Sequence, residues 1–441
     1  MKKNNSDAND RLNSWKEIAV YLCCDIRTCR RWEITKKLPV HRIGRSEKAR
    51  IFAYPQELDR WLRKQARNSN GFRQVFYLPS EYRIAAIAVV CILIGVAGFF
   101  IINRFSLDRN PADFRIERST LIVLNQDSRR LWIYDTGIEN LAQDSSYRAY
   151  TQYKRNFGDG CVEFPLIIIK DIQGDGQNEV LFSIQTQDEA NEGLICFDPR
   201  GEVLWQFQGG RELRFGPKVY SGDYRIKGFE LEDIDGDGAQ EVLIISVHKP
   251  DWPCQLAILD SQGRMLAEYW NAGFIMDIVF HDLNGDGAEE MLLCGVSNEY
   301  GRGFFAVFDP ARIAGQSPHA DDRYRCAELG QGTYTHYVLF PRSDVRKDYP
   351  TEAALSIALQ DTGRLLFTTD HGGLIYELNP DLTVYYVTYS NTFREMHSAA
   401  RTAGLIDSVL DEEYRKRLMG GVQYYQAGKW IRSSSEYPEW P

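Results

Sequence analysis

The stretch KGFELEDIDGDGAQEVLIIS, Lys227–Ser246, places an acidic, glycine-containing loop between two apolar runs. Its nine central residues, Asp233–Glu241, recur without gaps as DIQGDGQNE at Asp171–Glu179 and as DLNGDGAEE at Asp282–Glu290. Each copy follows one apolar run and leads into another, which predicts two buried strands around each loop. The copies start 62 and 49 residues apart, a spacing typical of repeat architectures.

Oxygen-bearing side chains occupy positions 1, 3, 5 and 9 of each loop, and glycines occupy positions 4 and 6. Such ligands can converge on one hard cation if the chain turns tightly, and glycine permits the left-handed backbone that the turn needs. Calcium fits better than magnesium, which requires a stricter octahedron with more water. An ordinary Asp-Gly turn without a metal is the alternative. The predicted calcium ligands are Asp171, Gln173, Asp175 and Glu179; Asp233, Asp235, Asp237 and Glu241; and Asp282, Asn284, Asp286 and Glu290.

The three loops differ at position 3. The second loop has the full acidic set, whereas the third has Asn284, a common neutral substitute. The first has Gln173, which is longer and less suited, so we expect weak binding or none there.

These loops resemble the FG-GAP/VCBS repeats of integrin-like β-propellers, over roughly Leu166–Phe308. The resemblance implies an all-β propeller in which each loop joins two strands of a blade, with calcium bracing the turns. Five to seven blades would fit after Arg115. Further strand-turn-strand hairpins are predicted for GLICFDPRGEVLWQF, QLAILDSQGRMLAEY and GFFAVFDPARIAG, and, in blades without the metal loop, for LWIYDTGIENLA and GGLIYELNPDLTVYYV. Residues 394–419 predict a helical segment, and GGVQYYQAGKWIRS near the C-terminus a strand that closes the ring.

The charge of the chain is divided sharply. Met1–Ser80 holds 18 Lys and Arg against 8 Asp and Glu, whereas the remainder holds 34 against 53. A basic segment joined to an acidic body indicates an anionic partner for the first part alone.

Within the basic segment, Asn13 or Ser14 is a candidate N-cap for a first helix, and Asp25 for a second helix, IRTCRRWEITKK. Ile26, Cys29 and Trp32 predict the buried face of the second helix. A hairpin with Gly44 near its tip and a third helix beginning at Pro55 follow. Two helices joined by a tight turn, the second one basic, form a helix-turn-helix arrangement.

In order, WKEIA, RTCRRWE, LPVHR and the closing YPQELDRWL resemble the winged helix-turn-helix of MerR and excisionase-type proteins. The adjacent Cys23 and Cys24 depart from that pattern, which often has a Gly-containing turn there. The resemblance implies a DNA-binding domain over residues 1–67. The predicted DNA contacts are Arg27, Thr28, Arg30 and Arg31 in the second helix, and Arg42, Arg45, Lys48 and Arg50 in the wing. Docking onto a protein or the anionic membrane surface is the alternative.

Residues 84–102, IAAIAVVCILIGVAGFFII, contain no charged side chain and are long enough to cross a bilayer as one helix. A linker, residues 68–83, precedes this predicted transmembrane helix. The Lys/Arg excess of the N-terminal region predicts that the head is cytoplasmic and that residues 103–441 form an extracytoplasmic domain.

The sequence contains no phosphate-binding loop, GxSxG or HExxH motif, so we expect no enzyme activity. Gly332–Tyr337, GTYTHY, is an aromatic cluster that could line a ligand groove or form an ordinary hairpin face. None of the nine cysteines has CxxC spacing, which favours small buried side chains over a zinc or redox motif.

Together these features favour a membrane-anchored one-component transcription regulator, with possible homodimers whose paired heads bind an operator. The combined resemblances of the head and the repeats imply a bacterial protein. Its outer domain would sense an unidentified ligand or partner. A cell-surface adhesion protein with a basic docking head is the main alternative, and an anchored carbohydrate-active enzyme is a third.

Overall fold

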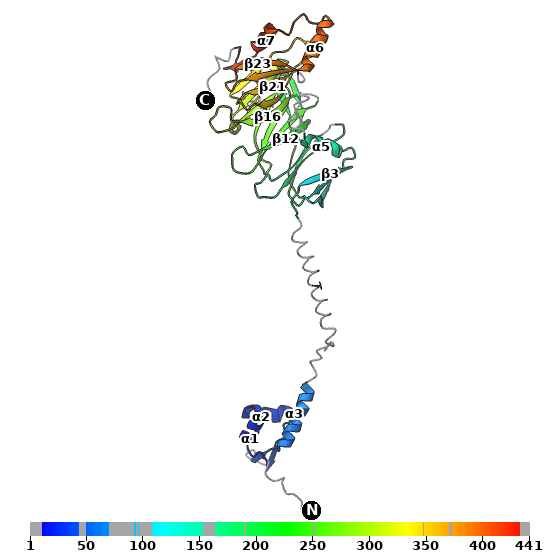
Figure 1. Cartoon of the computed structure of the whole chain (residues 1–441), viewed down its shortest axis with the longest axis vertical. Coiled ribbons are helices and arrows are strands. Elements are labelled where there is room, and N and C mark those ends of the chain that lie inside the picture. The colour runs from blue at the N-terminus through cyan, green and yellow to red at the C-terminus, as the bar shows by residue number, and fades with distance from the viewer. Residues whose placement is uncertain are drawn as a thin grey trace, which may run out of the picture. The chain divides into compact units, whose positions relative to one another are not determined.

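The computed structural model describes residues 11–43, 50–69, 92–93, 96, 108–152, 164–188, 191–249, 252–346, 348–369 and 373–432. The chain divides into two compact units, Met1–Ser106 and Leu107–Pro441 (Figure 1). We call them the head and the β domain.

In the described residues between positions 11 and 69, the head has three helices and one hairpin. The helices are α1 (Trp15–Tyr21), α2 (Ile26–Lys36) and α3 (Pro55–Ser69), and the antiparallel strands are β1 (His41–Ile43) and β2 (Arg50–Phe52). The order of elements, two helices, a hairpin and a third helix, is the one that the sequence predicts. The core is small and consists of Ile18, Ala19, Cys29, Leu38, Ile51, Ala53 and Leu58.

Both predicted helix caps are present. The Ser14 hydroxyl accepts a hydrogen bond from the Glu17 amide at 3.2 Å, and the Asp25 carboxylate accepts one from the Thr28 amide at 2.8 Å. Between the two helices Cys23 has a φ of +50°. The turn therefore keeps the left-handed conformation that glycine usually supplies, although cysteine occupies it.

The prediction for the buried face of α2 was wrong at Ile26, whose side chain is 40% exposed. Ile26 is the first residue of α2, where the helix has not yet reached the core. Cys29 is fully buried, and Trp32 packs against Trp61 of α3 with ring centroids 5.7 Å apart. The Trp61 indole N–H also donates to the Lys36 carbonyl at 2.8 Å, which fixes α3 to the end of α2.

In its described residues the β domain is mostly β, with five antiparallel sheets in chain order and one additional hairpin. The first sheet has β3 (Asp113–Glu117), β4 (Thr120–Leu124) and β5 (Arg130–Asp135); the second has β6 (Ile167–Lys170), β7 (Glu179–Gln185), β8 (Asn191–Phe197) and β9 (Val203–Phe207). The third has β12 (Tyr224–Glu232), β13 (Glu241–His248), β14 (Cys254–Leu259) and β15 (Met265–Asn271), after the hairpin β10 (Leu213–Phe215) and β11 (Lys218–Tyr220). The fourth begins with β16 (Ile275–His281), β17 (Glu290–Ser297), β18 (Arg302–Phe308) and β19 (His336–Leu339); the fifth has β20 (Ala354–Leu359), β21 (Leu365–Thr369), β22 (Leu374–Leu378) and β23 (Val384–Tyr389).

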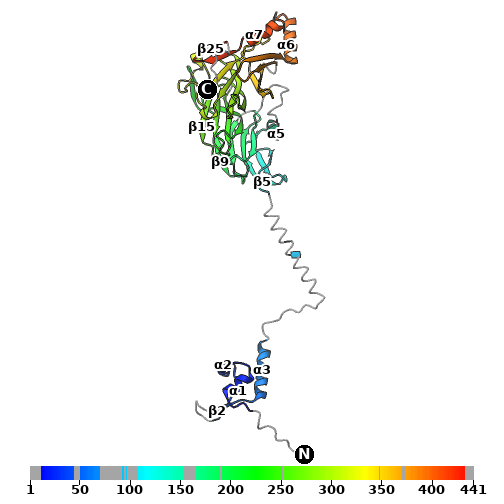
Figure 2. The same ribbon diagram turned by 60° about the vertical axis from the view of Figure 1, so that its left-hand side comes forward.

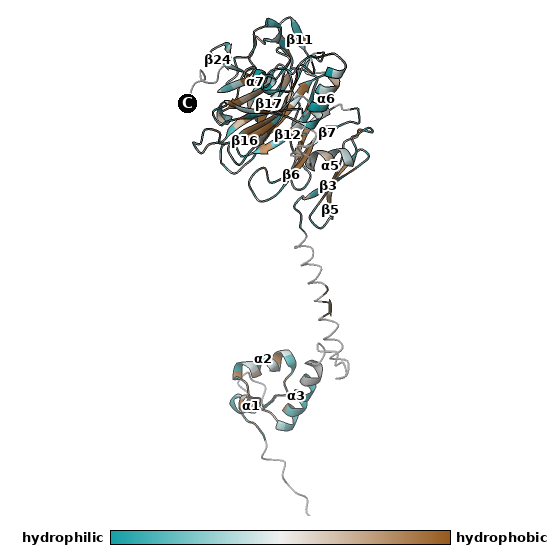
Figure 3. Ribbon diagram, turned by 45° about the horizontal axis from the view of Figure 1, so that its top comes forward, coloured by the Kyte–Doolittle hydropathy of each residue, from teal (hydrophilic) through white to brown (hydrophobic). Residues whose placement is uncertain are grey.

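The second, third and fourth sheets bury both faces of the strands β7, β13 and β17, which explains why these strands are nearly continuous apolar runs. In β13, Val242 and Ile244 face a core shared with the second sheet, while Leu243 and Ile245 face a core shared with the fourth. Side chains on a strand alternate between faces, so one apolar strand supplies two cores. Figure 3 shows one of these hydrophobic strands, β17, inside the domain.

The same packing connects each sheet to the next, as the blades of a propeller do. Separate cores join the first sheet to the second, the second to the third, the third to the fourth, and the fourth to the fifth. In Figures 1 and 2 the sheets follow one another in chain order, with the β3–β5 sheet and the β23 end of the domain far apart.

The C-terminal segment does not close a ring, contrary to the prediction. After α6 (Asn391–Thr402) and α7 (Glu412–Met419), the strands β24 (Gln423–Gln426) and β25 (Lys429–Ile431) join the fourth sheet, where β24 pairs with β19. Helix α7 contributes Tyr414 and Leu418 to the core between the fourth and fifth sheets. This packing directs the chain back to β19 rather than to the first sheet.

Two predicted hairpins were also wrong. After β18, Asp309 caps a short 3-10 helix, Pro310–Arg312, and the strand that follows in the sheet is β19. The segment after β5 forms no return strand and leads to the helix α5 (Asp144–Gln152). After β18 a residue that caps a helix follows the strand, so the local sequence there favours the helix over a tight hairpin.

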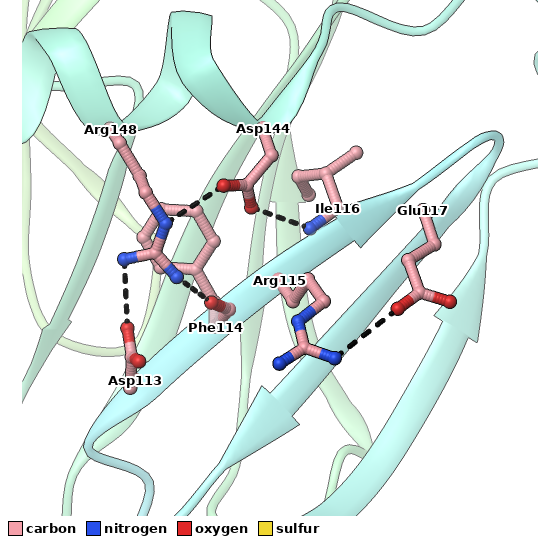
Figure 4. Close-up of polar contacts among 7 residues, drawn as sticks. All are labelled: Asp113, Phe114, Arg115, Ile116, Glu117, Asp144 and Arg148. Atoms are coloured by element: carbon pink, nitrogen blue, oxygen red, sulfur yellow. Dashed lines mark hydrogen bonds and ion pairs between the residues drawn. The ribbon is translucent and has the colours of Figure 1, made fainter. Parts of the chain in front are cut away.

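Helix α5 covers the edge strand β3 (Figure 4). The Asp144 carboxylate accepts a hydrogen bond from the Ile116 amide at 2.9 Å and pairs with Arg148 at 2.8 Å. The Arg148 guanidinium also pairs with Asp113 and lies over the Phe114 ring, 4.5 Å from its centroid. These contacts occupy backbone groups that an open sheet edge would leave available.

Within the described parts of the chain, no helix is both long and apolar enough to cross a membrane. Most of the predicted transmembrane segment, residues 84–102, lies outside the described residues. Three of its side chains, Ile92, Leu93 and Val96, are described, and each is helical and exposed.

Candidate functional sites: acidic loops and a basic helix

Each of the three acidic loops joins the first two strands of a sheet, as predicted. In each loop the position 1 aspartate accepts hydrogen bonds from the amides at positions 4 and 6. For Asp233 these come from Gly236 at 2.8 Å and Gly238 at 3.1 Å. Asp171 and Asp282 repeat the pattern. The glycines at positions 4 and 6 all have φ between +72° and +92°, so the turn requires them.

The position 9 glutamate closes each loop from the other end. One carboxylate oxygen of Glu179, Glu241 and Glu290 accepts a hydrogen bond from the position 2 amide, at 2.9, 2.8 and 2.8 Å. Burial raises the pKa of all three glutamates, and nearby aspartates of the same loop raise it further. A bound cation would act in the opposite direction, because it favours the charged carboxylate.

The second loop brings its three aspartates together. Oxygen atoms of Asp233, Asp235 and Asp237 lie within 4.8 Å of one another. Two oxygens bound to one calcium ion are at most about 5 Å apart, so this cluster fits the ion's coordination shell. In the described chain no Lys, Arg or His lies within ion-pair distance of these carboxylates.

The first and third loops differ from the second at position 3. In the third loop the Asn284 amide nitrogen donates to Asp286 at 3.1 Å and to Glu290 at 2.7 Å. This neutral NH₂ group thus hydrogen-bonds to two carboxylates of the loop. In the first loop the Gln173 side chain is exposed. The three loops therefore share one backbone conformation but differ in the side-chain ligands that they offer.

The first two loops also touch each other. The Gln240 amide donates to the Ile172 carbonyl at 2.7 Å, and the Lys170 ammonium group donates to the Gln240 side chain at 2.6 Å. A Cβ atom on Gly174 would lie 2.8 Å from the Gly238 carbonyl oxygen. Glycine at position 4 of the first loop is thus required twice, by its φ and by its neighbour.

Helix α2 presents a basic outer face in the head. Arg27, Arg30 and Arg31 are exposed, and none has a carboxylate partner within 4 Å in the described part of the chain. The Arg30 guanidinium lies 5.7 Å from the Trp15 ring centroid, which orients it without neutralising it. Ile34 shares this face and is 81% exposed. Its spacing from Arg27, Arg30 and Arg31 would have identified it in the sequence.

The other predicted DNA contacts are less available. Thr28 bonds to the Asp25 carboxylate through both its amide and its hydroxyl, at 2.8 and 2.6 Å. Arg42 pairs with Glu33 at 2.9 Å, and Arg50 is exposed. Arg45 and Lys48 lie outside the described residues. The accessible set is therefore Arg27, Arg30, Arg31 and Arg50.

The aromatic cluster at Gly332–Tyr337 is packing rather than a groove. Tyr337 is 1% exposed and stacks on Phe304 with centroids 5.1 Å apart, and His336 is 4% exposed. The described cysteines of the β domain, Cys196, Cys254, Cys294 and Cys326, are buried and unpaired. Cys161 lies outside the described residues.

No family model and no curated protein matches this chain. Among solved structures, a protein of unknown function from Bacteroides caccae is 12% identical, with a TM-score of 0.28 over 64% of this chain and 74% of that one. The Dos1 propeller is 10% identical, with a TM-score of 0.30 over 62% and 65%. Rhamnogalacturonan lyase YesW is 10% identical, with a TM-score of 0.29 over 71% and 59%. These distant likenesses bear on neither the ligand nor the activity of this chain.

Proposed function

We propose that this chain is a membrane-anchored one-component transcription regulator. The observation that carries the proposal is the outer face of α2, where the exposed Ile34 lies beside three arginines that have no carboxylate partner in the described part of the chain. Guanidinium groups recognise phosphates and the edge of guanine, and an apolar side chain can contact the thymine methyl group. A helix with this face, capped and fixed by α1 and α3, is suited to the major groove.

The β domain is proposed to lie outside the cell, as a propeller whose acidic loops bind calcium. Extracellular calcium sites bind in the range of about 10⁻⁴ to 10⁻³ M, so such loops would fill outside the cell and remain largely empty in the cytosol. The apolar segment 84–102 and the basic N-terminal region support this orientation. Protease added to intact cells should then digest the β domain and leave the head protected, whereas digestion of the head would reverse the assignment.

The DNA-binding proposal is tested by capturing chromosomal DNA with the full chain in living cells. We expect a few shared sequences to be enriched, and a double change Arg30→Ala and Arg31→Ala to abolish the enrichment. Arg60→Ala with Arg63→Ala, on α3, is the matched control for lost charge and should retain it. Sequence-independent capture, or equal enrichment by the Arg30/Arg31 variant, would refute the operator model and favour a docking role for the head.

A further inference from the structure

A cavity of about 740 Å³ lies where the C-terminal segment returns to the fourth sheet. Its walls come from the start of β18, the loop after β19, helix α7, strand β24 and the residue after β25. Figure 2 shows β25 and α7 at the same end of the domain. The close approach of these segments requires Gly421, because a Cβ atom there would lie 2.8 Å from the Pro341 side chain.

The lining of this cavity is strongly basic. It contains the side chains of Arg302, Arg342, Lys416, Arg417 and Arg432. Its single acidic side chain, Asp344, accepts hydrogen bonds from the Tyr414 hydroxyl at 2.5 Å and from the Arg417 guanidinium at 3.2 Å. Asp344 therefore balances Arg417 and leaves the other four cations without a carboxylate partner within 4 Å in the described chain.

These cations are held close to one another. Arg302 is half-buried and donates to the neutral Gln423 side chain. Burial lowers the pKa of Arg302, and the positive charges of Arg432 and Arg342 lower it further, while Glu352 opposes them. Gathering like charges in a partly desolvated place is unfavourable unless an anion compensates for them.

Backbone groups fix the orientation of Arg342. Its guanidinium donates to the Arg346 carbonyl at 3.0 Å and to the Tyr349 carbonyl. Its Nε atom is buried and has no hydrogen-bond partner among the described residues. Such carbonyl bonds orient a guanidinium without neutralising it, which is how an anion site keeps its charge.

The remainder of the domain makes this charge unusual. Residues 81–441 carry 34 basic and 53 acidic side chains, yet this one cavity gathers five basic side chains and one acidic. On an ordinary solvated surface, basic side chains would be spread among acidic ones. A volume of about 740 Å³ lies in the range of about 300–1,000 Å³ that is typical of small-molecule sites.

We propose that this cavity binds a small polyanion that carries two or more carboxylate, sulfate or phosphate groups. The β domain would receive its ligand through this cavity. The proposal therefore rests on the proposed function of the chain and adds the chemical class of its ligand. Arg302 and Arg342 form the inner wall, and Lys416 and Arg432 contact the ligand from the exposed rim.

The test is calorimetric titration of the full chain, purified in detergent, with citrate, inorganic pyrophosphate and trigalacturonate. The free calcium concentration is held constant, because citrate and pyrophosphate chelate the ion. We expect at least one of these anions to bind, with maltotriose, a neutral oligosaccharide, as the negative probe. Preference for citrate or trigalacturonate would assign the ligand to the carboxylates, and preference for pyrophosphate to the phosphates.

Lys416→Gln and Arg432→Gln each remove one cation at an exposed position, so both variants should fold. Each should weaken binding at least tenfold, whereas Arg312→Gln, an exposed arginine outside the cavity, should not. Failure of all three anions to bind, or equal binding by the Lys416 and Arg432 variants, would overturn the proposal. DNA capture by the head provides a separate readout. Failure of anion binding therefore does not decide whether the head binds DNA, and failure of DNA capture does not decide whether the cavity binds an anion.

Discussion

The acidic loops and the basic cavity lie in the same domain and are built in opposite ways. Each loop is nine consecutive residues whose own carboxylates hold its backbone, as Asp233 does for Gly236 and Gly238. The cavity takes its cations from segments as far apart as Arg302 and Arg432. A site made by one stretch can be read in the sequence, whereas a site made by distant stretches exists only once the fold has brought them together.

The largest effect should come from removing the anchor of the C-terminal strands. Tyr424 is 2% exposed, and its hydroxyl donates to the Leu382 carbonyl at 2.9 Å. Tyr424→Ala should reduce the free energy of unfolding by about 3–5 kcal/mol. Anion binding should disappear with it, while the calcium-dependent rise in Tm should remain.

Denaturant unfolding with and without calcium measures this difference. Tyr424→Phe is the matched control and should cost only about 1 kcal/mol, because it removes one hydrogen bond. Loss of both calcium and anion responses in Tyr424→Ala would show that the two regions are not independent.

The second prediction concerns the stability of the β domain at acid pH, which depends on a histidine in the strand beside the cavity. Burial lowers the pKa of His336 in β19 from 6.5 to about 4. Between these two pKa values the native state binds fewer protons than the unfolded state. The contribution of neutral His336 to the free energy of unfolding is therefore complete above pH 6.5. It should be lost as the pH falls toward 4, by about 3 kcal/mol. Unfolding of His336→Gln, measured in chelator from pH 7 to 4.5, should show a smaller acid loss than the parent chain.

The third prediction is a change in stability whose sign depends on whether calcium is present. Asp237→Asn keeps the acceptor that binds the Ala239 amide at 2.7 Å but removes one of three clustered charges. In chelator the change should be neutral or stabilising by up to about 1 kcal/mol, because it relieves repulsion. In millimolar calcium it should destabilise the domain relative to the parent, as thermal unfolding would reveal.

Asp381→Asn is the matched control for this change. Asp381 accepts a hydrogen bond from the amide two residues ahead, at Thr383, as Asp237 does from Ala239. It lies outside the acidic loops, so its effect should be the same with and without calcium. The same calcium response in both variants would contradict a metal site at the second loop.

The smallest expected effect is a gain of function in the first loop. Gln173→Asp completes the acidic set on a backbone that already has the right turn. Equilibrium dialysis should then show one additional calcium ion per chain, with a change in stability below about 1 kcal/mol. Gln177→Asp adds the same charge at a position without a ligand role and should add no ion.

The local part of the fold could be predicted. The caps at Ser14 and Asp25, the head hairpin and the position of each acidic loop between two strands follow from short stretches of sequence. The glycine pattern of the loops is specific because their φ values exclude other residues. The same reasoning applies to the arginine face of α2, which one helical period defines.

The non-local part of the fold could not be predicted from the sequence. The pairing of β24 with β19 depends on how α7 packs against the fifth sheet, and nothing within Gln423–Gln426 specifies that partner. The segment after β18 resembles the other strand-turn-strand segments until Asp309 begins a 3-10 helix. The five cations of the cavity are unremarkable where they stand in the sequence, because their significance arises from mutual proximity.

The return of β24 to β19 also has a kinetic consequence. The complete fifth sheet and two helices lie between these strands in the chain, so the fourth sheet cannot be finished until nearly all of the domain has been made. Closing so long a connection comes late, whereas each acidic loop closes within one hairpin. The cavity is therefore among the last native features to form. A ligand bound there would mainly slow unfolding and would do little to speed folding.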